Sequence, residues 1–333
     1  MASPAQLIDL AAQRQAQSAA ALGKRNPDPG RVPNLSPASA PNGVAAVLAA
    51  QRLQQFRLDY DSEERVLWCQ FEYTGRPCFS PTVLNEAQAV QRLVRDISLA
   101  AQGAGDEPPL RYMVLGSRAP GVWNLGGDLE LFATLIRRRD RAELTRYAHL
   151  CCEVGYINAT LYQLPVITVA LVQGDALGGG FEAVMSSNLV VAERSAKFGL
   201  PEVLFNLFPG MGAYTFMARR IAPGLAERII LSGEIFTAEK LHEMGMIDIL
   251  APDGAGVDAF YDVIGRGGRR HQTHLALRGA RRLVHPLGFE EMARIADMWV
   301  EAAFKLEESD LKKMLRLATA QDRRRERLTP QPG

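Results

Sequence analysis

The sequence predicts an α/β protein whose C-terminal region is entirely helical. Strand-like and helix-like segments alternate through the middle of the chain, whereas residues 287–327 show only helical patterns. The apolar run at residues 165–172 is rich in β-branched side chains, which suits a strand buried on both faces of a parallel sheet.

The chain is expected to open with a flexible arm, residues 1–55. This segment is rich in Ala, Gln, Pro, Ser and Asn, and such a composition cannot bury enough apolar surface to offset the entropy lost on folding. Only short helical patches are expected in it, at residues 2–22 and 44–56. The rest of the chain is expected to divide into an α/β core, a helical region and a tail, at residues 56–255, 256–327 and 328–333.

Local patterns predict the elements of the core in chain order. Residues 65–73 alternate in the manner of a strand, and Ser80 is a good N-cap for a helix that continues to residue 100. The elements expected after this helix are a strand at 113–117, helices at 129–138 and 141–161, the buried strand at 165–172, a short helix at 181–187 and a strand at 188–192.

Composition indicates a soluble cytoplasmic protein. Of the 333 residues 47% are hydrophobic, and 38 basic against 37 acidic side chains leave a charge of +1, so neither nucleic acid nor an anionic membrane is expected as the main partner. No signal-peptide pattern opens the chain, and the longest apolar run, residues 164–172, is far shorter than the roughly twenty residues of a membrane helix. The four cysteines lack CxxC spacing and are expected to be reduced thiols.

Three consecutive glycines, Gly178 to Gly180, follow the buried strand and precede a helix that carries Glu182 near its start. Free N–H groups at such a turn and at a helix N-terminus can hold a developing oxyanion. Alone the pattern is weak, because most glycine clusters are only tight turns. It is not the GxGxxG fingerprint of a dinucleotide site.

Two further segments carry candidate site residues. Residues 124–128, Asn-Leu-Gly-Gly-Asp, form a second glycine-rich turn before a helix, or else an ordinary loop with Asp128 as a helix cap. In residues 198–212, Glu202 stands among apolar neighbours. If buried, its carboxyl would have the raised pKa that a general acid needs; the alternative is a solvated loop glutamate.

Together and in this order, the three segments resemble the crotonase (enoyl-CoA hydratase/isomerase) superfamily. The resemblance rests on residues 124–128, on Ala-Leu-Gly-Gly-Gly-Phe-Glu at 176–182, and on Pro201-Glu202 followed by Pro209-Gly210, with the glutamates twenty positions apart. It covers residues 58–320 and implies a crotonase-type ββα spiral core. Within the superfamily the chain is most similar to the diffusible signal factor synthases, through four stretches at 123–132, 170–183, 199–214 and 297–300.

The resemblance implies an enzyme that acts on a 3-hydroxyacyl thioester, linked to acyl carrier protein in the signal synthases or to coenzyme A in the hydratases. Glu182 and Glu202 would be the acid/base pair. The thioester carbonyl would lie between the N–H of Leu125 or Gly126 and that of Gly179. Dehydration and thioester hydrolysis would release a cis-2-unsaturated fatty acid, a quorum-sensing signal, and neither step needs a metal or another cofactor. The residues leave open which glutamate is the acid.

A fatty chain requires an apolar tunnel. Its candidate lining residues, for which plain core packing is the alternative, are Leu204, Phe205, Leu207, Phe208, Met211, Met298 and Trp299. Arginine clusters at 137–139, 219–220, 269–270 and 323–325 are either docking sites for an acidic carrier protein or solvated helix faces. His271 and His274 lack a third ligand, so no metal site is expected. A sensor histidine kinase and a homotrimer are candidate partnerships by resemblance.

Two other functions stay open. A coenzyme A-dependent enoyl hydratase or isomerase would use the same pair of glutamates. A binding or regulatory protein built on a crotonase scaffold would require neither of them.

Overall fold

The computed structural model describes residues 43–104, 107–265 and 268–328. They belong to one compact unit, Leu35–Gly333; a second unit, Met1–Asn34, and the helical patch expected at residues 2–22 lie outside the described residues. Just before the boundary predicted near residue 56, helix α2 (Val44–Ala49) buries Val44 and Leu48. Packing therefore already begins within the last part of the predicted arm.

Six strands form the main sheet, in the order β1-β2-β3-β5-β7-β10. They are β1 (Phe56–Asp61), β2 (Val66–Phe71), β3 (Tyr112–Ser117), β5 (Ile167–Val172), β7 (Leu189–Glu193) and β10 (Ile249–Ala251). β1 runs antiparallel to β2, and the other neighbours are parallel. Every residue of β5 is buried, so the apolar run at 165–172 is the covered central strand that the sequence predicts.

A second sheet of short strands positions the glycine motifs. Its order is β4-β6-β8-β9, with the strands β4 (Val122–Asn124), β6 (Asp175–Leu177), β8 (Lys197–Gly199) and β9 (Ile235–Thr237). β4 and β6 are parallel, and Asn124 pairs with Ala176. Because parallel strands end at the same edge of a sheet, the glycine turns that follow β4 and β6 meet there. These strands are too short to leave a pattern in the sequence, so local patterns did not predict them.

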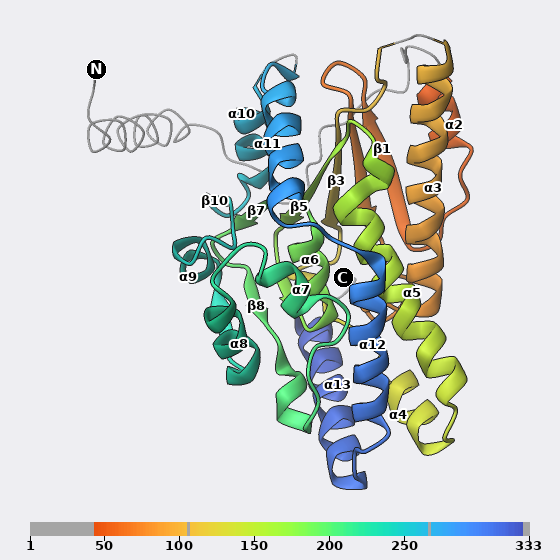
Figure 1. The fold of residues 1–333 in the computed structure, drawn as a ribbon, viewed down its shortest axis with the longest axis vertical. Helices are drawn as coiled ribbons and strands as arrows, with labels where there is room; N and C mark the ends of the chain where they lie inside the picture. The colour runs from red at the N-terminus through yellow and green to blue at the C-terminus, as the bar shows by residue number, and fades with distance from the viewer. Residues whose placement is uncertain (1–42, 105–106, 266–267, 329–333) are drawn as a thin grey trace. The chain divides into compact units, whose positions relative to one another are not determined.

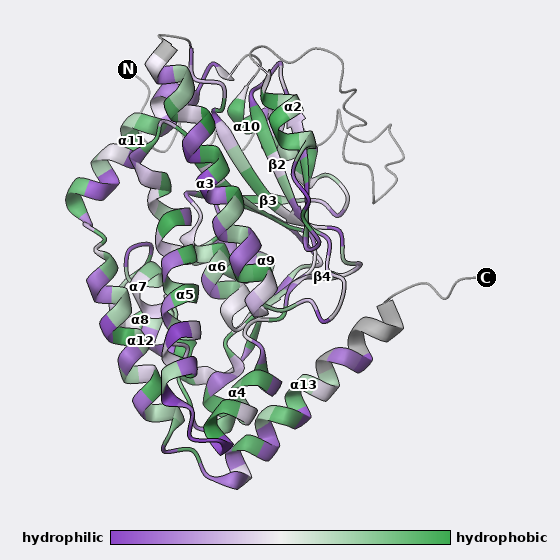
Figure 2. Cartoon of the chain, turned by 90° about the vertical axis from the view of Figure 1, so that its right-hand side faces the viewer, coloured by the Kyte–Doolittle hydropathy of each residue, from purple (hydrophilic) through white to green (hydrophobic). Residues whose placement is uncertain are grey.

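Helices cover both faces of the main sheet (Figure 1). On one face α10 (Gly256–Ile264) buries Phe260 and Ile264 against the strands. On the other face α3 (Pro81–Ala104) and α5 (Arg141–Thr160) pack side by side, and Val90 and Val94 lie against β2 and β3. Hydrophobic residues dominate β2 and β3, whereas hydrophilic and hydrophobic segments alternate along α12 and α13 (Figure 2).

The remaining helices are short or lie toward the C-terminus. They are α4 (Leu129–Arg137), η2 (Leu161–Gln163), α6 (Gly179–Ser186), η3 (Pro201–Phe205), α7 (Ala213–Met217), α8 (Pro223–Ser232), α9 (Ala238–Glu243), α11 (His271–Val284), α12 (Phe289–Ala303) and α13 (Glu308–Leu328). α12 packs along α5, and α13 packs against α4. The α/β class with a helical C-terminal region is therefore confirmed. Within the described part of the chain, no helix has both the length and the apolarity that crossing a bilayer requires.

Candidate active site

The turn between β6 and α6 fits only glycine at two of its three glycine positions. Gly178 has φ +52°, a left-handed backbone conformation, and its N–H donates to the carbonyl of Gly199 at 2.8 Å. A Cβ added to Gly180 would lie 2.2 Å from the carbonyl oxygen of Asn124. The glycines thus let the start of α6 sit directly on the first glycine turn.

The first glycine turn is held by hydrogen bonds that use two of its N–H groups. Leu125 N–H donates to the carbonyl of Pro77 at 2.8 Å, and Gly126 N–H donates to Oδ1 of Asn124 at 2.7 Å. The N–H groups of Leu125 and Gly126, the two predicted oxyanion donors of this turn, are therefore both engaged within the protein.

The next residue, Gly127, has an N–H close to the start of α6. A Cβ added to Gly179 would lie 3.4 Å from the Gly127 nitrogen, so the two backbones approach closely. Neither Gly127 N–H nor Gly179 N–H donates to another described residue. Two N–H groups placed in this way can hold one negatively charged oxygen, and the N-terminus of α6 adds its positive dipole end. In the sequence, the position of Gly127 directly before the helix cap Asp128 is the signal that could have indicated this N–H group.

Glu182 lies in the first turn of α6, and the residue is 4% exposed. Its Oε1 accepts hydrogen bonds from the backbone N–H groups of Met211 and Ala213, each at 2.9 Å. Burial raises the pKa of this carboxyl, while the two N–H donors act in the opposite direction by stabilising the carboxylate. Glu182 is thus a buried acid whose ionised form is stabilised by two backbone N–H donors.

Glu202 lies in η3, and its carboxyl group reaches the turn that precedes α6. A Cβ added to Gly178 would lie 2.7 Å from its Oε1, and among the described residues its buried Oε2 has no hydrogen-bond partner. Burial raises the pKa of Glu202, and the charge of Glu182 raises it further. The structure therefore brings the two predicted glutamates together, and it favours the proton on Glu202 and the charge on Glu182.

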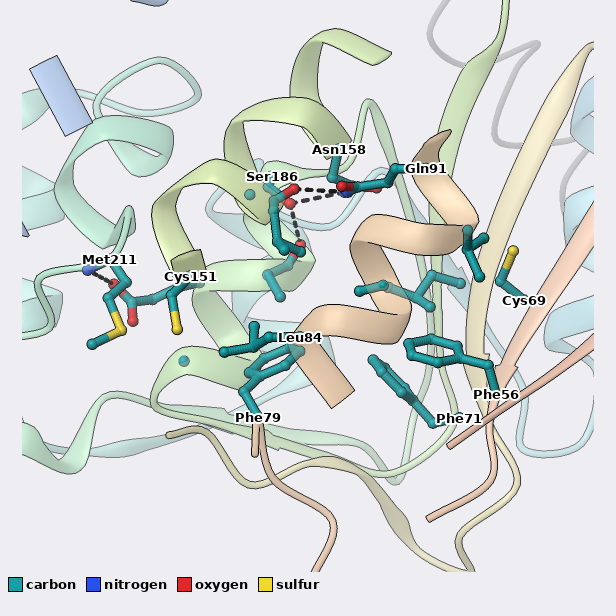
Figure 3. Close-up of a pocket in the computed structure, with 18 of the residues that line it drawn as sticks. Phe56, Cys69, Phe71, Phe79, Leu84, Gln91, Cys151, Asn158, Ser186 and Met211 are labelled. Atoms are coloured by element: carbon teal, nitrogen blue, oxygen red, sulfur yellow. Dashed lines mark hydrogen bonds between the residues drawn. The ribbon is translucent and has the colours of Figure 1, made fainter. Parts of the chain in front are cut away.

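A largely apolar cavity is lined by Glu182 and by Gly127 and Gly179, the two glycines with unengaged N–H groups. It lies between α3, α5, α6 and the strands β1 to β3. Figure 3 shows Met211 toward one end of it and Phe56 and Phe71 toward the other. The cavity is suited to hold an apolar chain whose polar end lies at the glycine turns.

Of the seven predicted tunnel residues, only Met211 lines this cavity. Leu204 and Met298 are 57% and 64% exposed. Trp299 is buried but packs against Phe132 and Gly210, and the remaining three, Phe205, Leu207 and Phe208, belong to the core cluster or pack against it. Core packing, the alternative weighed for these residues, describes most of them. The lining residues of α3 and α5 could not be singled out from the sequence, because their helical spacing is that of any buried helix face.

Several of the other predicted binding residues have protein partners. Arg137 pairs with Glu308, Arg219 with Glu291 and Arg220 with Asp248. His274 contacts the hydroxyl of Tyr112 at 3.2 Å. The described residues contain no group of three or more His, Cys, Asp or Glu side chains that could hold a metal ion.

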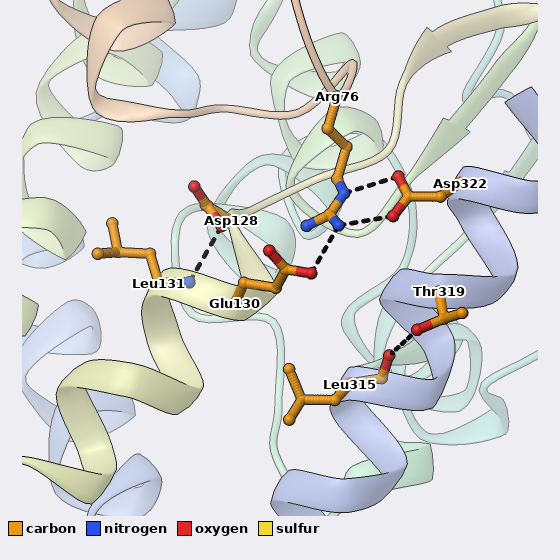
Figure 4. A network of polar contacts seen from close by, with 7 residues as sticks. All are labelled: Arg76, Asp128, Glu130, Leu131, Leu315, Thr319 and Asp322. Atoms are coloured by element: carbon orange, nitrogen blue, oxygen red, sulfur yellow. Dashed lines mark hydrogen bonds and ion pairs between the residues drawn. The ribbon is translucent and has the colours of Figure 1, made fainter.

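An ion-pair clamp ties the C-terminal helix to the first glycine turn (Figure 4). Arg76 donates to both carboxylate oxygens of Asp322 on α13, at 2.8 and 2.6 Å, and to Glu130 on α4 at 2.8 Å. The segment that follows Arg76 pairs with the turn, since Phe79 N–H donates to the carbonyl of Gly126 at 2.7 Å. The clamp thus fixes the strip of backbone on which the turn rests.

Comparison with known proteins finds enoyl-CoA hydratases among the relatives of this chain. The chain is 26% identical over 171 residues to human mitochondrial methylglutaconyl-CoA hydratase, an alignment that covers 51% of this chain and 48% of that protein. The chain therefore spans about half the length of this relative, and the same holds for its mouse and rat counterparts.

Solved structures share the fold. Enoyl-CoA hydratase from Bacillus halodurans matches with a TM-score of 0.63 at 19% identity, over 79% of this chain and 100% of the other. Pseudomonas aeruginosa DspI matches with a TM-score of 0.56 at 19% identity, over 75% and 87%. The profile of the enoyl-CoA hydratase/isomerase family matches residues 81–266, which is more than half of the sequence. The chain therefore belongs to the enoyl-CoA hydratase/isomerase family.

Proposed function

We propose that this protein removes water from a 3-hydroxyacyl thioester and then hydrolyses the thioester, releasing a cis-2-unsaturated fatty acid. One observation carries the proposal: two buried carboxyl groups with unequal hydrogen bonding lie beside two unengaged N–H groups, at an apolar cavity. The likeness of the sequence to the diffusible signal factor synthases supports the choice of product.

The chemistry follows from these groups. The N–H groups of Gly127 and Gly179 would bind the thioester oxygen, which acidifies the α-proton. One glutamate takes that proton while the other protonates the departing 3-hydroxyl, so that the C3–O bond breaks and water leaves. We assign the resting charge to Glu182, which has two N–H donors, and the resting proton to Glu202, which has an unpartnered oxygen.

Hydrolysis can use the same site. An ionised glutamate would take a proton from water, the resulting hydroxide would add to the thioester carbon, and the thiol would leave with the proton. The N–H groups of Gly127 and Gly179 would stabilise the tetrahedral oxyanion during this step.

A coenzyme A-dependent hydratase or isomerase is the second candidate, and family membership favours it. The two candidates differ in product. The hydratase would interconvert two thioesters and release no acid, whereas the proposed enzyme would release a free unsaturated acid. Acyl carrier protein is the proposed thiol carrier of the substrate, and coenzyme A is the alternative.

Mass spectrometry of the products tests the proposal, with one 3-hydroxyacyl group supplied on carrier protein and on coenzyme A. Glu182→Gln and Glu202→Gln are each expected to lower the rate of free-acid release by about 10²- to 10⁴-fold, the usual contribution of a general acid or base. Glu193→Gln is the matched control, because Glu193 is a buried glutamate on β7 that is bonded to Gln173 and to Gly256 N–H, outside the cavity.

Three results are informative. Free unsaturated acid from wild type and from Glu193→Gln, but not from the two site variants, would support the proposal. An unsaturated thioester with no free acid would favour the hydratase. Unchanged release in both site variants would contradict any role of the pair.

A further inference from the structure

One wall of the apolar cavity is polar. Gln91 on α3, Asn158 on α5 and Ser186 on α6 all line it, and they are 4%, 5% and 3% exposed. Figure 3 shows the three side chains together, on the side of the cavity away from the Phe79 and Phe71 rings. Ser186 lies one helical turn beyond Glu182 on α6, about 6 Å along the helix axis.

Gln91 occupies a position where helical spacing predicts an apolar residue. Leu84, Ala87 and Gln91 are three and four residues apart on α3, so they share one face, and all three line the cavity. A buried amide on such a face breaks the local pattern, and such exceptions concentrate at functional sites.

The hydrogen bonds of Gln91 fix which atom is unused. Its Nε2 donates to the carbonyl of Val154 at 2.9 Å, which sets the orientation of the amide. Its Oε1 is buried and receives no donor from any described residue. Gln91 therefore offers the cavity wall a hydrogen-bond acceptor, and one N–H of its amide is used by Val154.

Asn158 is arranged in the same way. Its Nδ2 donates to the hydroxyls of Ser186 and Ser187, at 2.8 and 3.2 Å, and Ser186 donates its own proton to the carbonyl of Ala183. The Asn158 side-chain oxygen receives no donor from the described residues. Two amide oxygens thus lack donors on one wall, and the ligand group that complements them must be a hydrogen-bond donor.

We propose that this wall is a subsite for a hydroxyl group on the acyl chain of the substrate, farther from the thioester than the 3-hydroxyl. The inference rests on the proposed function, since it assumes that an acyl chain occupies the cavity. A hydroxyl can donate to Gln91 Oε1 or to the Asn158 oxygen, whereas an ionised terminal carboxylate has no proton to donate to these oxygens. The preferred substrate is then a hydroxylated fatty acyl thioester, not a plain one.

The test measures binding without turnover. Calorimetric titration would compare a medium-chain saturated fatty acid with the set of its singly hydroxylated positional isomers, on the full chain. One isomer is expected to bind wild type at least about tenfold more tightly than the parent acid, because it satisfies a buried acceptor. Gln91→Leu is expected to remove this preference and to bind the parent acid as well as, or better than, wild type does.

Gln102→Leu is the matched control, because it makes the same change on an exposed position of the same helix, outside the cavity. It should keep the preference. The proposal is overturned if every hydroxylated isomer binds wild type no better than the parent acid, the result expected when water alone serves these oxygens. It is also overturned if no acid binds, or if Gln91→Leu keeps the preference. The comparison in wild type decides the question even if Gln91→Leu does not fold.

This result is independent of catalysis. Selective binding of one hydroxylated isomer, together with failure to release unsaturated acid, would contradict the proposed function but support the hydroxyl subsite. Release of unsaturated acid with no preference among isomers would do the reverse.

Discussion

At the scale of single residues, the two site glutamates differ in how much their ionised forms destabilise the fold. Glu182 has two N–H donors for one oxygen, whereas Glu202 has a buried oxygen without a donor. An ionised carboxylate in such a position is disfavoured, which is why the pKa of Glu202 lies above its ordinary value of 4.5. Glu202 therefore keeps its proton well above pH 4.5, and its ionisation destabilises the fold.

Glu202→Gln should therefore stabilise the protein increasingly as pH rises. The unfolded chain ionises Glu202 near its ordinary pKa of 4.5, below the raised pKa of the folded state. Stability is therefore lost as pH rises through this interval, by up to about 1.4 kcal/mol per pH unit. Urea unfolding is expected to show a gain from Glu202→Gln that is roughly 1 to 3 kcal/mol larger at about pH 8 than at about pH 5. A gain that is independent of pH would contradict this account.

Gly179→Ala should remove activity and leave the fold intact. The added Cβ would meet its nearest atom, Gly127 N, at an ordinary 3.4 Å, so it fits sterically but occupies the space between the two N–H donors. Turnover of the thioester is expected to fall by about 10²- to 10³-fold, with a melting temperature close to that of wild type.

Two other glycine substitutions serve as comparisons for Gly179→Ala. Gly178→Ala would force a Cβ to within 2.7 Å of Glu202 Oε1 at φ +52°, so it should lower the melting temperature as well. Gly279→Ala, on α11 with no atom within 4 Å of the new Cβ, should leave activity unchanged. Equal turnover in Gly179→Ala and wild type would exclude Gly179 as an oxyanion donor.

At the scale of elements, the ion-pair clamp predicts that α13 influences the site from a distance. Asp322→Asn removes the charge that holds Arg76, and the backbone after Arg76 supports the first glycine turn. A small displacement of an oxyanion donor lowers the rate more than it lowers binding. We expect kcat to fall several-fold to about tenfold with KM nearly unchanged.

The same two helices offer a matched control for this change. Glu308→Gln breaks the ion pair between Glu308 on α13 and Arg137 on α4, whose side chains are 52% and 43% exposed. Exposed pairs contribute little, so kcat and stability should both stay near wild type. If Asp322→Asn and Glu308→Gln behave alike, the clamp has no role in positioning the turn.

At the scale of the whole molecule, local patterns predicted the long elements and the motifs predicted the two glutamates. The buried run at 165–172 is β5, and the helices expected at 129–138 and 141–161 are α4 and α5. Each of these is specified by residues close together in sequence. The pair Glu182 and Glu202 could be predicted from the sequence because each glutamate lies in its own motif.

Features that depend on distant contacts were out of reach. No residue near Leu125 in the sequence indicates that its N–H is bonded to Pro77. The choice of an oxyanion donor among Leu125, Gly126 and Gly127 therefore required the structure. Residues Leu161 to Gln163 adopt positive φ of 42°, 52° and 63°, and the carbonyls on either side of this turn accept hydrogen bonds from Arg278, more than a hundred positions away. The cavity likewise combines α3, α5, α6 and the sheet, which no single stretch of sequence describes.

The C-terminal helix is part of the core, and its removal provides the last test. Leu311, Met314 and Ala318 of α13 are buried in the main hydrophobic cluster. Burial of the two larger side chains is worth about 2 kcal/mol each, a large share of the roughly 5–15 kcal/mol that stabilises a typical domain. A chain that ends at Leu306 should therefore unfold at markedly lower denaturant concentration, and it should lose more activity than Asp322→Asn because the clamp and the packing disappear together. A chain that ends at Leu328 keeps every described residue and should match the full chain in both measurements. If the shorter chain retained full stability, α13 would be an appendage on the fold and the loss of rate in Asp322→Asn would need another cause.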